Sequence, residues 1–187
     1  AEGYRVLGEP RYLKAAERAA SFVLSTLVQK DGRLLRSYRL GEAKLNAYLE
    51  DYAYLADALI DLYEAGGDRR HLAAATVLAE RLLKDFAPDE GGAFFFVARD
   101  HEALIVRTRE GHDGATPNPS AVAAMALARL SYHLDMPAMR EAARLRRDLG
   151  PGRGTKRKRS PSPAKRHTRR RHSDSLTAAM KRLQVRG

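Results

Sequence analysis

Two kinds of apolar helix are predicted to alternate along the first 150 residues, and this alternation restricts the fold more than any other feature. Residues 12–28, 71–86 and 138–149 carry apolar side chains on one side and charged side chains on the other. Residues 48–65 and 120–134 are apolar over most of their surface, which is typical of a helix buried on several sides. The unit repeats at roughly 60–70 residues, as in stacked supersecondary units.

The alternation predicts two layers of helices. One-sided helices suit an outer ring, and helices that are apolar all round suit an inner ring. The long loops then lie at one end, before the N-termini of the inner helices, where a pocket is expected. The predicted fold class is therefore all-α, built of helical hairpins with about five helices present. An ordinary helical bundle is the alternative.

Local signals place the ends of these helices. The first helix has apolar residues at a period of about 3.6, namely Tyr12, Ala15, Ala16, Ala19, Phe22, Val23 and Leu27. Pro10 suits a helix start, because its missing N–H costs little there. Asp68 and Ser120 are expected to cap the helices that follow them.

Short strands are predicted inside the two long loops. Residues 33–40 have strand character after the Asp31–Gly32 turn. Between residues 87 and 119, the runs 94–97 and 104–106 predict a β-hairpin. The hairpins are thus expected as small insertions in a helical domain.

Charge divides the chain at about residue 150. Residues 151–187 hold 13 of the 34 Lys and Arg residues but only one of the 23 acidic residues, so the charge of this segment is +12. The charge of residues 1–150 is −1, and the two sum to the net charge of +11. We expect a hairpin-built domain at 1–149 and a basic low-complexity segment, mostly disordered, at 150–187.

The basic segment contains two clusters that indicate contact with nucleic acid: Lys156, Arg157, Lys158, Arg159, Arg169, Arg170 and Arg171. Such clusters predict weak, nonspecific, salt-sensitive binding to nucleic acid. Their spacing also resembles a nuclear import signal. Alternatively the segment is not a selected one, because out-of-frame translation of a GC-rich gene gives a similar composition.

Three motifs, taken in order, resemble a known family. Residues 46–65 read Asn-Ala-Tyr-Leu-Glu-Asp-Tyr-Ala-Tyr-Leu-Ala-Asp-Ala-Leu-Ile-Asp-Leu-Tyr-Glu-Ala, residues 91–96 read Gly-Gly-Ala-Phe-Phe-Phe, and Leu-Ile-Val-Arg at 104–107 leads to Asp-Gly-Ala-Thr-Pro at 113–117. Together they resemble the YyaL-like, spermatogenesis-associated thioredoxin-domain family. The resemblance covers residues 10–147.

The resemblance implies an N-terminal thioredoxin-like domain followed by a six-hairpin (α/α)6 toroid, similar to glycosidases and sugar epimerases. This chain contains no cysteine, and after the Asp-x-Ala-x-Pro motif it reads Asn-Pro-Ser-Ala at 118–121 where the family reads Ser-Gly-Asn-Ser. The hypothesis is a fragment of such a protein, with an incomplete carbohydrate-active-like toroid that is inactive alone. The alternatives are a noncatalytic interaction domain and a nucleic-acid-associated protein that acts through its basic segment.

Carboxylates near the N-termini of the inner helices are the catalytic candidates: Glu50, Asp51 and Asp113. Glycosidases use one carboxyl group as proton donor and another as nucleophile or base. We therefore expect Asp51 and Asp113 to face one concavity. The structural alternative is that Glu50 and Asp51 only complement the helix dipole, and that Asp113 only starts a turn.

Four further residues are candidates for substrate binding: Tyr48, Tyr52, His112 and Asn118. Aromatic rings stack on sugars through their apolar faces, and a histidine beside a carboxylate can act as acid or base. Core packing is the alternative for the tyrosines, and simple hydration is the alternative for the histidine. No cofactor is expected, and no metal site either, because the histidines lack the spacing of a ligand set.

The expected partners are a carbohydrate, the thioredoxin-like and remaining hairpin regions of the family, and nucleic acid for the basic segment. No apolar run approaches the ~20 residues that cross a bilayer, so no membrane partner is expected. No signal peptide is visible at the start of the sequence. The expected location is the cytoplasm, or the nucleus if the basic segment is genuine.

Overall fold

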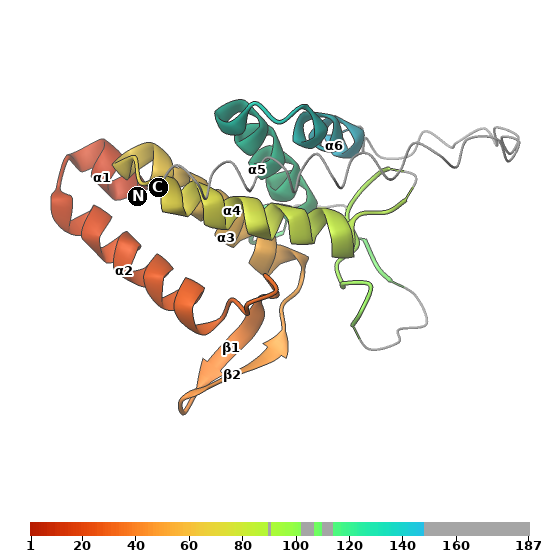
Figure 1. Ribbon diagram of the computed structural model, residues 1–187, viewed down its shortest axis with the longest axis horizontal. Coiled ribbons are helices and arrows are strands. Elements are labelled where there is room, and N and C mark those ends of the chain that lie inside the picture. Colours follow the sequence, from red (N-terminus) through yellow and green to blue (C-terminus); the bar gives the residue numbers. More distant parts are fainter. Residues whose placement is uncertain (90, 102–106, 110–113, 148–187) are drawn as a thin grey trace, which may run out of the picture. The chain divides into compact units, whose positions relative to one another are not determined.

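A computed structural model describes residues 1–89, 91–101, 107–109 and 114–147, and these residues are mostly helical (Figure 1). The elements that they form are α1 (Glu2–Leu7), α2 (Pro10–Thr26), β1 (Leu35–Arg39), β2 (Glu42–Asn46), α3 (Leu49–Gly66), α4 (Arg69–Arg81), a π-helical turn (Leu82–Phe86), α5 (Pro119–Leu134) and α6 (Pro137–Arg147). The predicted all-α class is confirmed at this level. The arrangement of these hairpins as part of an incomplete toroid stays a prediction.

Helix α3 lies at the centre of the described domain and packs against both α4 and α5. Its buried residues are Leu49, Tyr52, Ala53, Ala56, Leu59, Ile60 and Leu62. These positions cover more than one side of the helix, as its nearly uniform apolar sequence predicts. Helices α3 and α4 form one hairpin and α5 and α6 form another, each joined by a tight turn (Figure 1).

The helix ends follow the local chemistry, with one correction. Asp68 caps α4 as predicted, because its carboxylate accepts a hydrogen bond from the Arg70 backbone N–H at 2.9 Å. Ser120 does not cap α5: the cap is Asn118, which accepts from the Ser120 N–H at 2.8 Å. Pro119 explains the shift, because proline is favoured at the first helical position and moves the cap to the residue before it.

The predicted strand at 33–40 is one half of a β-hairpin. Strands β1 and β2 pair in antiparallel register, with Leu35 opposite Asn46 and Arg39 opposite Glu42. Leu40 and Gly41 join them with φ of 52° and 85°, the positive values that a type I′ turn requires. The second strand of this hairpin was not predicted.

The predicted strand at 94–97 is wrong. The Phe95 N–H donates to the carbonyl of Phe86 at 2.9 Å, and the Phe96 N–H donates to the carbonyl of Thr108 at 2.9 Å. Residues 94–97 are not in a strand. The bond to Phe86 packs the segment on the π-helical turn, and Phe94 is fully buried. Its predicted partner at 104–106 lies outside the described residues.

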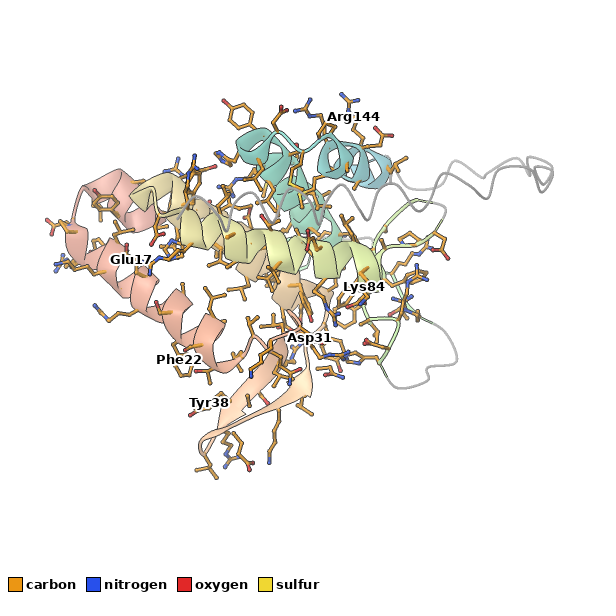
Figure 2. All side chains as sticks on the ribbon, viewed as in Figure 1. Glu17, Phe22, Asp31, Tyr38, Lys84 and Arg144 are labelled. Atoms are coloured by element: carbon orange, nitrogen blue, oxygen red, sulfur yellow. The ribbon has the colours of Figure 1, made fainter. Side chains whose placement is uncertain are left out.

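Helix α2 does not bury the stripe that its sequence presents. Of its residues, all of which the structure describes, Ala20 alone is buried. Tyr12, Ala15, Ala19 and Phe22 are exposed. Phe22 instead meets Tyr38 of β1 edge to face, with ring centroids 5.4 Å apart (Figure 2). Amphipathic spacing predicted the helix correctly, but it did not predict that the packed helices would leave this side uncovered.

Among the described residues, no helix is both long and apolar enough to cross a bilayer. The predicted basic segment at 150–187 lies outside the described part of the chain, and so do its candidate residues Lys156 to Arg159 and Arg169 to Arg171.

Candidate functional site

The predicted acidic residues lie in the first turn of α3, where one arginine holds both. Arg36 of β1 places Nη2 2.9 Å from Glu50 Oε1 and Nη1 3.1 Å from Asp51 Oδ2. All three side chains are partly exposed, between 26% and 38%. The guanidinium therefore binds both carboxylates, offsets one of their two negative charges, and ties the β-hairpin to the start of α3.

Asp51 has a second structural role. Its Oδ2 accepts a hydrogen bond from the Tyr48 backbone N–H at 2.8 Å, which satisfies a donor that the first helical turn leaves unpaired. Burial raises the pKa of Asp51, while this hydrogen bond and Arg36 oppose the rise. The Asp51 carboxylate therefore has two structural partners, the Tyr48 backbone N–H and the Arg36 guanidinium.

Aromatic rings surround this charged cluster. Tyr48 stacks on Phe96 with ring centroids 5.0 Å apart and an angle of 11° between the planes. The guanidinium carbon of Arg36 lies 4.8 Å from the Tyr48 ring centroid, within the range of a cation–π contact. His101 lies 5.3 Å from the same ring. Tyr48, Phe96 and His101 are all partly exposed, so this end of α3 is a mixed aromatic and ionic surface.

Tyr52 is a core residue, and its predicted role in substrate binding is wrong. Its side chain is 3% exposed and packs against Phe86, with ring centroids 5.2 Å apart. Its hydroxyl accepts a hydrogen bond from the Leu34 backbone N–H at 2.8 Å, and burial raises the pKa of the phenol. Tyr48 is the N-cap of α3 and has an extended backbone, whereas Tyr52 lies within the helix and its ring packs on Phe86.

The remaining candidates divide into one structural residue and two that are not described. Asn118 caps α5, where its amide oxygen accepts from the N–H groups of Ser120 and Ala121. Asp113 and His112 lie outside the described residues, so the shared concavity of Asp51 and Asp113 stays a prediction. Within the described ranges, no group of three His, Asp or Glu side chains has the arrangement of a metal site.

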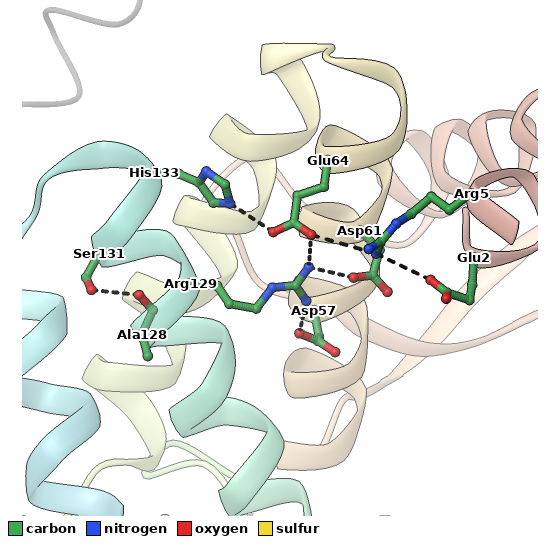
Figure 3. Close-up of polar contacts among 9 residues, drawn as sticks. All are labelled: Glu2, Arg5, Asp57, Asp61, Glu64, Ala128, Arg129, Ser131 and His133. Atoms are coloured by element: carbon green, nitrogen blue, oxygen red, sulfur yellow. Dashed lines mark hydrogen bonds and ion pairs between the residues drawn. The ribbon is translucent and has the colours of Figure 1, made fainter.

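A second ionic cluster, which the sequence reading missed, joins α3 to α5 (Figure 3). Arg129 places Nη1 2.5 Å from Asp57 Oδ1, and Nη2 2.6 Å from Asp61 Oδ1 and 2.9 Å from Glu64 Oε2. His133 places Nε2 2.9 Å from Glu64 Oε1. The cluster therefore holds α3 and α5 together through charge-assisted hydrogen bonds.

The pKa values of this cluster follow its contacts. Burial raises the pKa of Asp57, although Arg129 opposes the rise. Burial also acts to raise the pKa of Glu64, but the hydrogen bonds from His133 and Arg129 prevail and lower it. A signal for the cluster was present in the sequence, since Asp57, Asp61 and Glu64 follow helical spacing along one side of α3.

The chain is similar in sequence to several known proteins. No family model matches the chain. The chain is 31% identical over 150 residues to uncharacterized protein B0495.5 of Caenorhabditis elegans, covering 76% of this chain and 20% of that protein. It is 32% identical over 135 residues to spermatogenesis-associated protein 20 of Homo sapiens, covering 67% of this chain and 17% of that protein. The protein of the same name from Mus musculus is 37% identical over 84 residues, covering 44% of this chain and 11% of that one.

The described residues define the chain as a mostly helical protein built on paired helices. The chain belongs to the family of spermatogenesis-associated protein 20, which agrees with the resemblance carried by the sequence motifs. The chain spans a fifth or less of the length of the relatives that it matches. The toroid and the thioredoxin-like domain stay expectations.

Proposed function

We propose that the chain is a noncatalytic helical-hairpin segment of a larger protein of this family, and that it turns over no sugar alone. The observation that carries the proposal is the double ion pair of Arg36 with Glu50 and Asp51. A glycosidase needs two carboxyl groups that flank the scissile bond and exchange protons with it. Glu50 and Asp51, adjacent in one helical turn and bound to one guanidinium, do not by themselves form such a pair.

The segment would serve the larger protein by positioning its own helices. Arg36 fixes the β-hairpin to α3, and Arg129 fixes α3 to α5. The regions expected to complete the assembly are the remaining hairpins and the thioredoxin-like domain that the resemblance implies. Groups on the far side of a substrate would have to come from those regions.

A turnover assay tests the proposal. Purified chain is incubated with a panel of disaccharides and N-acylated sugars, and hydrolysis and epimerisation are followed by NMR. We expect no turnover, both in the parent chain and in Glu50→Gln. Turnover that Glu50→Gln abolishes while the helical circular dichroism signal is unchanged would contradict the proposal.

The partly exposed aromatic surface favours a second proposal, that this end of α3 forms part of a carbohydrate-binding surface. Tyr48 and Phe96 present stacked rings beside the charged groups of Arg36 and Glu50, and sugar recognition combines such apolar faces with polar groups. Saturation-transfer NMR with the same sugars tests it. We expect a transfer signal that Phe96→Ala reduces and Phe22→Ala, in an exposed aromatic of α2, does not. No signal with any sugar, or equal loss in both variants, counts against this proposal.

The basic segment supports a separate proposal from its composition, namely nonspecific nucleic-acid binding through the clusters at 156–159 and 169–171. Truncation after Gly150 should abolish binding to duplex DNA, and binding by the full chain should weaken steeply with salt. Equal binding by the truncated chain would contradict it.

A further inference from the structure

Arginine side chains gather around the partly exposed ring of Phe95. The guanidinium carbons of Arg107 and Arg109 lie 4.1 Å and 4.4 Å from the Phe95 ring centroid, and both distances are within the range of a cation–π contact. Burial and the nearby charges of Arg99 and Arg109 lower the pKa of Arg107. Three cations therefore lie close enough to repel one another, and an anion placed among them would relieve that repulsion.

Backbone carbonyl groups hold Arg107 in place. Its Nε donates to the Val97 carbonyl at 3.0 Å, and its Nη2 donates to the Asp85 carbonyl at 2.9 Å. The carboxylate of Asp85 binds Arg81 instead. A cation is favourable beside carbonyl groups at the end of a helical turn, but a carbonyl group carries no full negative charge. Arg107 is therefore fixed in position without an ion pair to any described residue.

The charges around the Phe95 ring do not balance within the described part of the chain. Asp89 supplies the one carboxylate contact of this cluster, with Oδ1 3.0 Å from Nη2 of Arg99. Arg109 is exposed, and among the described residues its guanidinium contacts the Phe95 ring but no carboxylate. Three guanidinium groups with one contacting carboxylate leave two positive charges in excess.

We propose that Arg107 and Arg109 beside Phe95 form a binding site for a phosphate dianion, either free or carried as a monoester by a small molecule. Planar guanidinium groups bind phosphate oxygens through paired N–H donors. Both groups contact the same ring, so one tetrahedral anion can bridge them. A phosphate monoester, whose second pKa is about 6, carries nearly two negative charges at neutral pH, which matches the excess positive charge. A single carboxylate would offset only half of it.

NMR titration of the full chain tests the inference, because the Nε–H signal of each arginine separates this site from the basic segment at 150–187. At fixed ionic strength, inorganic phosphate should shift the Arg107 and Arg109 signals saturably, whereas glucose should not shift them. The affinity should rise between pH 5 and pH 7, as phosphate loses its second proton near pH 6. Tighter binding of glucose 6-phosphate assigns the site to a phosphorylated small molecule, and tighter binding of inorganic phosphate assigns it to the free ion. Absent or non-saturating shifts with both would overturn the inference.

Substitution of an arginine outside the site gives the matched control. Arg109→Gln, read at the Arg107 signal, should weaken phosphate binding by about tenfold or more, because it removes one of two charge-assisted partners. Arg140→Gln changes an exposed arginine of α6 and should alter the affinity by less than about twofold, because water and salt screen a charge outside the site. Equal losses in both variants would overturn the inference, because they indicate a general effect of net charge. If Arg109→Gln loses its helical circular dichroism signal, Arg109→Lys replaces it and must also weaken binding, since lysine lacks the paired donors.

Two acidic residues that border this segment in sequence, Glu102 and Glu110, give the last control. Glu102→Gln and Glu110→Gln should each bind phosphate within about twofold of the parent, because screening weakens a charge that does not touch the ligand. A gain of about tenfold in either variant would overturn the inference, because the chain's own carboxylate would then be the partner of these arginines.

Discussion

Helices α2 and α5 have almost the same length, 17 and 16 residues, and they differ sharply in burial. The sequence of α2 separates apolar and charged residues cleanly, whereas α5 is apolar nearly all round. Yet α2 buries only Ala20, while α5 buries a full side of the helix and contacts α3, α4 and α6. Amphipathic spacing therefore identifies a helix, but the elements packed beside it determine how much of its apolar face is removed from water.

The comparison divides the described domain into a packed centre of α3, α4 and α5 and an edge formed by α2. Apolar burial contributes about 25 cal/mol per Å², so the centre should supply most of the folding free energy. Both regions still expose apolar residues, among them Phe22 of α2 and Tyr132 of α5. The predictions below test this division, from the largest expected effect to the smallest.

The largest effect is expected at the buried ion pair between α4 and the π-helical turn. Arg81 Nε lies 3.0 Å from Asp85 Oδ2, and both side chains are nearly buried. Arg81→Leu leaves the carboxylate of Asp85 without its partner and should lower the free energy of unfolding by about 3–5 kcal/mol at neutral pH. Urea denaturation measures the change.

The pH dependence of this variant has a defined sign. Burial raises the pKa of Asp85, and Arg81 opposes the rise, so removing Arg81 raises the pKa further. When folding raises the pKa of a carboxyl group, the free energy of unfolding falls as pH rises from the unfolded pKa through the folded pKa. The penalty of Arg81→Leu should therefore shrink as pH falls to about 4. An equal penalty at both pH values would show that Asp85 is not its cause.

Next in size is a matched pair within α5. Leu127 is fully buried, while Met125, two residues earlier, is 49% exposed. Leu127→Ala should lower the free energy of unfolding by about 2–5 kcal/mol, because it leaves a cavity. Met125→Ala should change it by about 0.5 kcal/mol or less, when measured at concentrations where the chain is monomeric. Similar losses in both variants would contradict the orientation of α5.

A smaller effect is expected where α3 meets α5. Arg129→Met removes the cation shared by Asp57, Asp61 and Glu64 and should cost about 1–3 kcal/mol, because these charge-assisted bonds are only partly screened by water. Arg70→Met is the control, since its ion pair with Asp68 leaves the arginine side chain 91% exposed. Chemical denaturation should show a smaller loss in the control, below about 1 kcal/mol, because water screens an exposed ion pair. A loss as large as in Arg129→Met would show that the shared position of Arg129 is unimportant.

The smallest effect concerns the cap of α4. Asp68→Ala removes the hydrogen bond to the Arg70 N–H and should cost about 1 kcal/mol. The contacts with Arg70 lower the pKa of Asp68 to about 2, so its contribution is present above the unfolded value of 3.8 and is lost as pH falls towards 2. Asp68→Asn keeps a capping oxygen but cannot titrate. Its thermal stability should therefore fall less between pH 4 and pH 2 than that of the parent, and an identical fall would contradict this role.

Much of the helical framework was predictable because its signals are local. Apolar periodicity located α2, α3, α4, α5 and α6, and Asp68 marked a cap by its residue type alone. Helix α1 was not predicted, because it is a single short stretch without a buried residue. The strand predicted at 94–97 failed because its backbone groups bond to Phe86 and Thr108, a pairing set by tertiary contacts that strand propensity does not report.

The candidate site was predicted in part. The acidic residues were correctly placed at the start of α3. The role of Arg36 was missed because Arg36 belongs to the preceding β-hairpin, and its distance in sequence from Glu50 and Asp51 matches neither the helical nor the strand repeat. Tyr48 and Tyr52 show the same limit. Both fall in the helix predicted at 48–65, and the contacts with Phe86 and Leu34, which come from other parts of the chain, place Tyr52 inside.

Native-state hydrogen exchange tests the division into a packed centre and an edge most directly, because it measures the opening free energy of each helix separately. We expect amides of α3, α4 and α5 to exchange only through global unfolding. Amides of α2 should exchange through a local opening of much lower free energy, even though α2 is one of the longest described helices. Leu127→Ala should then reduce protection throughout the centre and leave that of α2 almost unchanged. Protection of α2 equal to that of α3 in the monomeric chain would contradict the account.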